Sequence, residues 1–82
     1  MSENNKLNDS VKSLAEVEEG RQVIFVAFEG GFGARKRIAD MGLTSGERFA
    51  LIAKREKGPY IILLKGSRVA IGRGMAEKII IR

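Results

Sequence analysis

Three consecutive cations, Arg35, Lys36 and Arg37, are the side chains of this sequence whose types and spacing best suit binding chemistry. Arginine binds carboxylates and phosphates through two parallel hydrogen bonds, and lysine adds a compact positive charge. Phe32 lies one helical turn earlier, and an aromatic ring beside cations is a common contact surface. We therefore expect this segment to contact an acidic partner. The alternative is a solvated helix face, in which Asp40 pairs with Lys36 or Arg37.

Catalytic and metal chemistry is poorly supported by the residue types present. The sequence contains no Cys and no His, which removes thiol nucleophiles, the Ser-His and Cys-His arrangements and the usual zinc ligands. Glu16, Glu18 and Glu19 could hold a hard cation, but they lack the glycine-punctuated spacing of a calcium loop and are more simply solvated. The sequence does not indicate any pair of carboxylates that would act as general acid and general base in catalysis. We expect neither an enzyme nor a bound cofactor or metal ion.

Glycines at 30, 31 and 33 precede the cations, at a position where backbone amides could approach a phosphate group. The segment has no Gly-Lys-Ser/Thr ending, and its spacing is not that of the dinucleotide fingerprint. A turn from a strand into a helix is the better interpretation.

A short helix must position the three cations. Ala34, Ile38 and Met41 recur at i, i+4 and i+7, which predicts a narrow apolar stripe facing the core. Gly42 follows the stripe at the place where a helix commonly ends in a left-handed residue, and Leu43 is then placed to pack back onto Ile38.

The net charge of +5 is unevenly placed. Residues 1–20 hold two lysines against five acidic residues, whereas residues 21–82 hold 13 basic against five acidic residues, a balance of +8. Such a surface suits nucleic acid, an anionic membrane face or an acidic protein patch.

The remaining pattern predicts an all-β protein with short helices. Residues 1–12 are polar and without period, and we expect a flexible tail there, followed by one domain over residues 13–82. Ser13 and Glu16 fit a capping box, which favours one helical turn over residues 14–18 that docks Leu14 and Val17 on the barrel. Five short strands are expected, at residues 21–29, 47–54, 60–65, 68–71 and 78–81.

Short strands joined by tight turns suit a small closed barrel, because closure removes unpaired sheet edges. We predict an SH3-like barrel with one helix between strands 1 and 2 and a one-turn helix before strand 5. The longest apolar runs, residues 23–28 and 60–64, are far shorter than the roughly 20 residues of a transmembrane helix. The first residues carry no signal-peptide pattern, so a cytoplasmic location is expected.

Residues 37–46, RIADMGLTSG, resemble the Arg-Leu-x-Asp/Glu-Leu/Met-Gly-Leu-x-x-Gly core of ferrous iron transport protein A, the FeoA family. Residues 14–20 are similar to its opening Leu-x-x-Leu-x-x-Gly, and Gly58-Pro59 precedes the middle strand in the same way. The closing Leu-Ala-Leu and Ala-x-x-Ile-x-Val pattern is similar to residues 69–71 and 76–81. The resemblance covers residues 14–82.

This resemblance implies a cytosolic SH3-like barrel that assists FeoB, a membrane GTPase-linked ferrous iron transporter, by docking on its cytosolic side. It implies a non-enzymatic role. The same barrel also follows the DNA-binding domain of iron- and manganese-dependent repressors. No helix-turn-helix precedes it in this sequence, so the stand-alone interpretation is preferred.

We therefore expect the partner to contact the basic helix and two apolar residues beside it, a surface made of Phe32, Arg35, Lys36, Arg37 and Leu43. A small basic nucleic-acid-binding barrel is the alternative, although the sequence has one Tyr and no Trp for base stacking. Direct binding of ferrous iron is not expected without His or Cys. Sheet edges in a small barrel permit a weak homo-oligomer.

Overall fold

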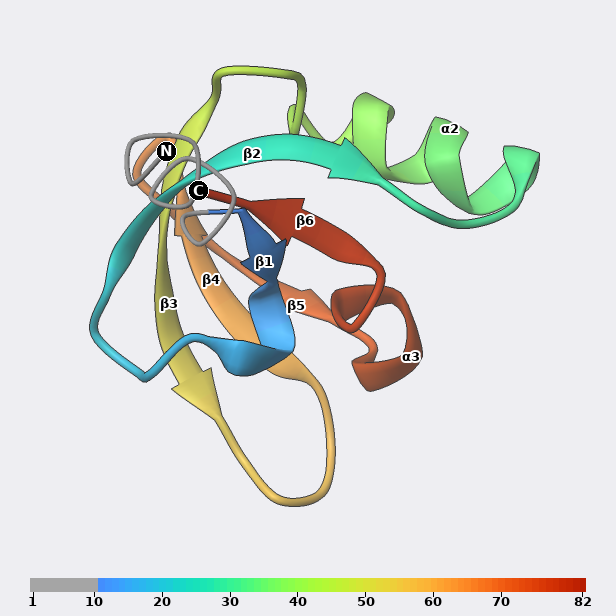
Figure 1. Ribbon diagram of the computed structural model, residues 1–82. Helices are drawn as coiled ribbons and strands as arrows, with labels where there is room; N and C mark the ends of the chain where they lie inside the picture. Colours follow the sequence, from blue (N-terminus) through green and yellow to red (C-terminus); the bar gives the residue numbers. More distant parts are fainter. Residues whose placement is uncertain (1–10) are drawn as a thin grey trace, which may run out of the picture.

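The computed structural model describes residues 11–82, which form a six-stranded antiparallel sheet with three short helical segments (Figure 1). The strands follow the order β1-β6-β2-β3-β4-β5 across the sheet. The chain runs through β1 (Lys12–Ser13), the 3-10 helix η1 (Leu14–Glu16), β2 (Gln22–Phe28), α2 (Phe32–Asp40), β3 (Arg48–Lys54), β4 (Tyr60–Leu64), β5 (Ser67–Ile71), α3 (Arg73–Ala76) and β6 (Ile79–Ile81).

This order confirms the predicted five strands, the helix between the first two of them and the single turn before the last. The additional strand β1 was not predicted, because two residues are too few to show a period. Lys12 pairs with Ile81, so the sheet begins within the segment predicted to be a tail. The rest of that prediction, residues 1–10, lies outside the described residues.

Alternating residues of the strands build one apolar core. Phe49 and Leu51 of β3 point inward with Tyr60, Ile62 and Leu64 of β4, as their period of two predicts. Register shifts between Phe25 and Ala27, and between Leu51 and Ala53, interrupt the ladders of β2 and β3. Such irregularities bend a strand and increase its twist, which suits a sheet that curls into a barrel.

The end of α2 has the predicted glycine cap. Gly42 adopts a φ of +105°, the left-handed region in which a side chain is strained. Its N–H donates to the Ala39 carbonyl at 3.0 Å, and the N–H of Leu43 donates to the Ile38 carbonyl at 3.2 Å. These two bonds form the Schellman motif, which satisfies the last carbonyls of the helix and turns the chain back toward the core.

The predicted capping box is also present, although η1 is a 3-10 turn of three residues and shorter than expected. The Ser13 hydroxyl accepts from the Ala15 N–H at 3.0 Å, and the Glu16 carboxylate accepts from the Ser13 N–H at 3.3 Å. Leu14 and Val17 are buried, as predicted. The Lys54 ammonium donates to the carbonyls of Ala15 and Val17, which holds this turn against β3.

The turn between β4 and β5 consists of Lys65 and Gly66, with φ values of 53° and 81°. Two consecutive positive φ values are typical of a type I′ hairpin, whose twist matches that of the flanking strands. The prediction placed this turn one residue later, at Gly66 and Ser67.

Candidate partner-binding surface

The helix α2 leaves the barrel wall at the end of β2 and presents its outer side to solvent (Figure 1). The Phe32 side chain is 84% exposed at its start, the largest exposure among the big apolar residues that the structure describes. Arg35, Lys36 and Arg37 are also exposed. We call these four residues the α2 surface.

The four side chains of the α2 surface do not all lie on the same side of the helix. At about 100° per residue, Phe32, Arg35 and Lys36 lie on the outer side, whereas Arg35 and Arg37 are about 200° apart around the axis. Arg37 therefore lies on the opposite flank of the helix from Arg35. The structure brings Phe32, Arg35 and Lys36 together, and it separates Arg37 from Arg35.

One of the three cations has an intramolecular partner. Lys36 Nζ lies 3.3 Å from Asp40 Oδ2, with both side chains about two-thirds exposed. An exposed pair of this kind contributes little to stability. Among residues 11–82, the other ion pair joins Lys65 and Glu47, so Arg35 and Arg37 have no carboxylate partner there. Lys36 therefore forms the exposed ion pair with Asp40 that was predicted as the alternative. Arg35 and Arg37 remain able to bind carboxylates of a partner.

The prediction that Leu43 is a surface contact was wrong. Its side chain is 1% exposed and belongs to the core cluster with Ile38. The physical reason is the Schellman motif, because the residue after the left-handed glycine packs back onto the helix. Leu43 fixes the end of α2, and Phe32 is the large apolar residue that this helix exposes.

An open groove of about 410 Å³ runs between α2 and β2. The helix supplies Arg35, Ile38 and Ala39, and the groove is otherwise lined by Phe25, Ala27, Phe28, Leu43, Thr44 and Ser45. Arg35 is the one charged residue among them. Ala27 and Ala39 are exposed, and their small side chains leave the groove open. The sequence prediction did not find this groove, because it depends on the spatial proximity of two alanines from different elements.

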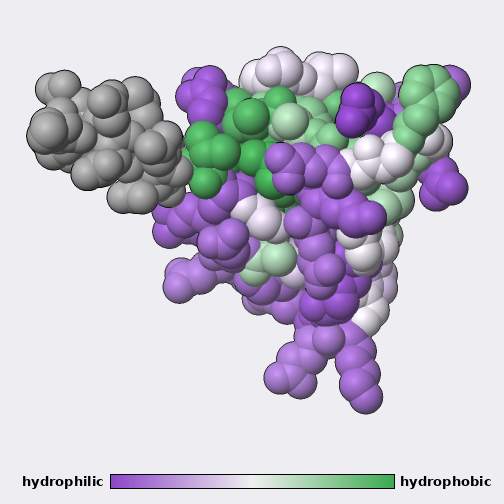
Figure 2. Space-filling view, turned by 45° about the vertical axis from the view of Figure 1, so that its right-hand side comes forward, coloured by the Kyte–Doolittle hydropathy of each residue, from purple (hydrophilic) through white to green (hydrophobic). Residues whose placement is uncertain are grey.

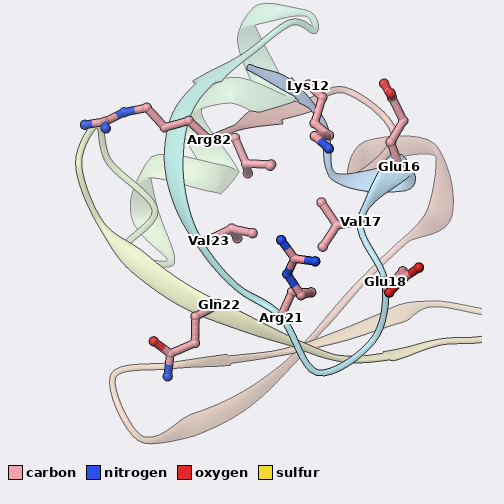
Figure 3. Close-up of a pocket in the computed structure, with 9 residues that line it drawn as sticks. Lys12, Glu16, Val17, Glu18, Arg21, Gln22, Val23 and Arg82 are labelled. Carbon is pink, nitrogen blue, oxygen red and sulfur yellow. The ribbon is translucent and has the colours of Figure 1, made fainter. Parts of the chain in front are cut away.

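A second hollow of about 330 Å³ lies between β1, the η1 turn, β2 and the end of the chain (Figure 3). Lys12 and Arg21 line it together with Glu16 and Glu18, so its charges are mixed. In Figure 3 the Arg21 guanidinium points into the hollow, and the two carboxylates lie apart on its rim. A ligand in this hollow would face both positive and negative side chains, so the lining favours neither an anion nor a cation.

Glu16 and Glu19, two of the acidic residues considered as ligands of a hard cation, instead make hydrogen bonds that stabilise the fold. Glu16 caps η1, and the Glu19 carboxylate accepts from the Lys54 backbone N–H at 2.7 Å. Residues 11–82 contain no group of three acidic side chains that could hold a metal ion.

Gly30 has a packing role in the turn from β2 into α2. A Cβ atom at this position would lie 2.3 Å from the Phe28 ring. The close approach of the backbone to this ring therefore requires glycine at position 30.

Aromatic residues do not form a base-stacking platform on the described surface. Phe25, Phe28, Phe49 and Tyr60 are buried, and Arg73 lies over the Tyr60 ring at 5.4 Å. Single-strand binders use several exposed rings on which successive bases stack. Phe32 is the one exposed aromatic residue in the described chain.

No helix in residues 11–82 is long and apolar enough to span a membrane.

A small curled antiparallel sheet of short strands places the chain in a fold class, the SH3-like barrels. Solved structures of similar fold support this class. A zinc complex of Stenotrophomonas maltophilia FeoA, described as an SH3 domain protein, superposes with a TM-score of 0.73 at 16% identity, over 85% of this chain and 88% of that chain. A manganese-dependent transcriptional repressor gives a TM-score of 0.78 at 18% identity, over 87% of this chain and 40% of the repressor.

The family follows from sequence as well as fold. The FeoA domain model matches residues 12–82. A Methanocaldococcus jannaschii protein named "Putative Fe(2+) transport protein A" is 43% identical over 68 residues, which are 83% of this chain and 82% of that protein. A crystal structure of an iron uptake regulatory protein (FeoA) has a TM-score of 0.80 at 38% identity, over 88% of this chain and 96% of that chain. The chain belongs to the FeoA family, as its motifs predicted.

Proposed function

We propose that this chain is a cytoplasmic accessory protein of ferrous iron uptake, which acts by binding rather than by catalysis. Its partner is a FeoB-type transporter, and it docks on the GTPase side of that protein. Membership of the FeoA family and the similarity to an Fe(2+) transport protein A support a role in iron transport. The Stenotrophomonas relative is described as a candidate activating factor of ferrous iron transport.

The observation that carries the docking proposal is the α2 surface. The Phe32 side chain is 84% exposed, is costly to leave in solvent and is not needed by the core. It lies on the same side of α2 as Arg35, which has no carboxylate partner in the described residues. Aromatic residues and arginine are enriched at protein interfaces, whereas lysine is depleted. Phe32 and Arg35 are therefore the residues that we expect to contribute most to binding.

Charge reversal tests this proposal. The double variant Arg35→Glu with Lys36→Glu should weaken binding to the soluble GTPase domain roughly tenfold, because two attractive contacts become repulsive. Isothermal titration calorimetry measures the dissociation constant. Thermal unfolding of the variant should match wild type, since both side chains are exposed.

The matched control is the double variant Lys57→Glu with Arg68→Glu. These two exposed cations lie in the β3–β4 turn and on β5, and the net charge changes by the same amount. The control should bind as wild type does. Equal weakening in both double variants would show that net charge, and not the α2 surface, determines binding.

A further inference from the structure

Partly exposed apolar residues of β2 and β6 adjoin the groove between α2 and β2 at Ala27. Ala27 pairs with Ile80 of β6, so these two residues share the outer face of the sheet. Ile24, Val26 and Ile80 are each partly exposed on β2 and β6. Figure 2 shows hydrophobic residues gathered in the upper part of one face, with hydrophilic residues below them. An apolar surface bordered by polar residues is typical of an interaction site.

The charge beside the groove indicates what kind of segment it binds. Arg35 is the one charged residue of the lining, and α2 carries three cations against the single acid Asp40, which pairs with Lys36. A segment with acidic residues would place a carboxylate against the Arg35 guanidinium. Its apolar side chains would replace water between Ala27 and Ala39.

We propose that this groove binds an acidic amphipathic segment of the transporter's cytosolic part, which inserts one large apolar side chain between Ala27 and Ala39. The volume of about 410 Å³ lies within the range of small binding pockets. Short amphipathic segments commonly lay their apolar face into such grooves. The inference rests on the proposed function, and it adds the chemistry of the bound segment and the place where it inserts.

Filling the groove tests the inference without removing any charge. Ala27→Leu and Ala39→Leu each place a larger side chain in the groove at an exposed position. The probe is the full-length FeoB-type transporter in nanodiscs that contain phosphatidylglycerol. We expect each variant to bind it roughly tenfold more weakly, because the lost burial of one leucine-sized side chain is worth about that much.

Ala70→Leu is the matched control, because Ala70 is an exposed alanine of strand β5, outside the groove lining. It should bind within about twofold of wild type, as expected for a surface substitution away from an interface. Methyl NMR of Ile38 and Leu43 gives a second readout on the wild-type chain, since both residues line the groove. Their methyl resonances should shift when the transporter binds.

The acidic character of the segment is tested at Arg35. Arg35→Gln should weaken binding at low ionic strength and reduce its salt dependence, because salt screens an exposed charge pair. An unchanged affinity and salt dependence would contradict an acidic segment.

The outcomes separate this inference from the proposed function. Equal binding by wild type, Ala27→Leu and Ala39→Leu would overturn the groove while leaving the docking proposal in place. Absence of any wild-type binding would overturn both. Binding to nanodiscs without transporter, lost in Ala39→Leu, would assign the groove to lipid and would also overturn the inference.

Discussion

Gly42 shows how a single residue sets the geometry of the candidate site. Its positive φ closes the Schellman motif, and the Lys65 ammonium lies 3.3 Å from the position that a Cβ atom would occupy. A side chain here would strain the backbone and displace Lys65. The end of α2, and with it the direction of the basic helix, depends on this glycine.

Gly42→Ala should lower the free energy of unfolding by about 1–2 kcal/mol, the usual cost of a left-handed non-glycine residue. Chemical denaturation measures the change. The control is Gly33→Ala, at a position within α2 where an added Cβ meets nothing within 4 Å. That variant should gain about 0.5–1 kcal/mol, because alanine is the better helix former. A stable Gly42→Ala variant would contradict the role of the cap.

Lys54 is a second residue with a specific structural role. Its ammonium donates to the carbonyls of Ala15 at 2.5 Å and Val17 at 2.9 Å, from a partly buried position. Lys54→Met keeps the aliphatic part of the side chain and removes both bonds. We expect a loss of about 1.5–3 kcal/mol, as found for hydrogen bonds to charged groups. Lys78→Met, at an exposed position, should leave the denaturation midpoint unchanged.

At the scale of elements, local rules predicted the parts of the fold that depend on a few neighbouring residues. The capping box at Ser13 and the glycine end of α2 each follow from short-range geometry, and each is present. The strand β1 escaped prediction because its pairing with β6 is a long-range contact without a local pattern.

The candidate site was less predictable from sequence. The cations are adjacent in the sequence, but the helical turn places Arg35 and Arg37 on opposite flanks. Leu43 follows a cap whose geometry buries it, so its assignment to the surface conflicted with the packing that the same motif predicts. The groove depends on Ala27 and Ala39, and no spacing rule relates two residues whose proximity is created by tertiary packing.

The contribution of the η1 turn can be measured at Ser13. Its hydroxyl accepts from the Ala15 N–H and donates to the Glu77 carbonyl at 2.8 Å, so it joins the turn to the end of α3. Ser13→Ala should cost about 1 kcal/mol, a typical value for the loss of a cap. Ser67→Ala, an exposed serine at the start of β5, serves as control and should lie within about 0.5 kcal/mol of wild type. A wild-type melting temperature in Ser13→Ala would rule out this link.

At the scale of the whole molecule, the barrel is a basic body, with a balance of +8 over residues 21–82. Charge alone suits either an acidic protein or nucleic acid. The buried aromatic residues favour the protein, because the described surface offers Phe32 and no row of rings for bases. A random DNA duplex should therefore compete poorly with the transporter domain, and any binding to it should decrease steeply with salt.

The most direct test of the account is an NMR titration of the isotope-labelled chain with the soluble GTPase domain of a FeoB-type transporter, repeated with a short random duplex. We predict chemical-shift changes centred on Phe32, Arg35 and Ala39 with the GTPase domain, and none with the duplex. Changes with the duplex alone would assign the protein to nucleic-acid binding. Changes with the GTPase domain that lie on β4 and β5, away from α2, would contradict the claim that the basic helix is the docking surface.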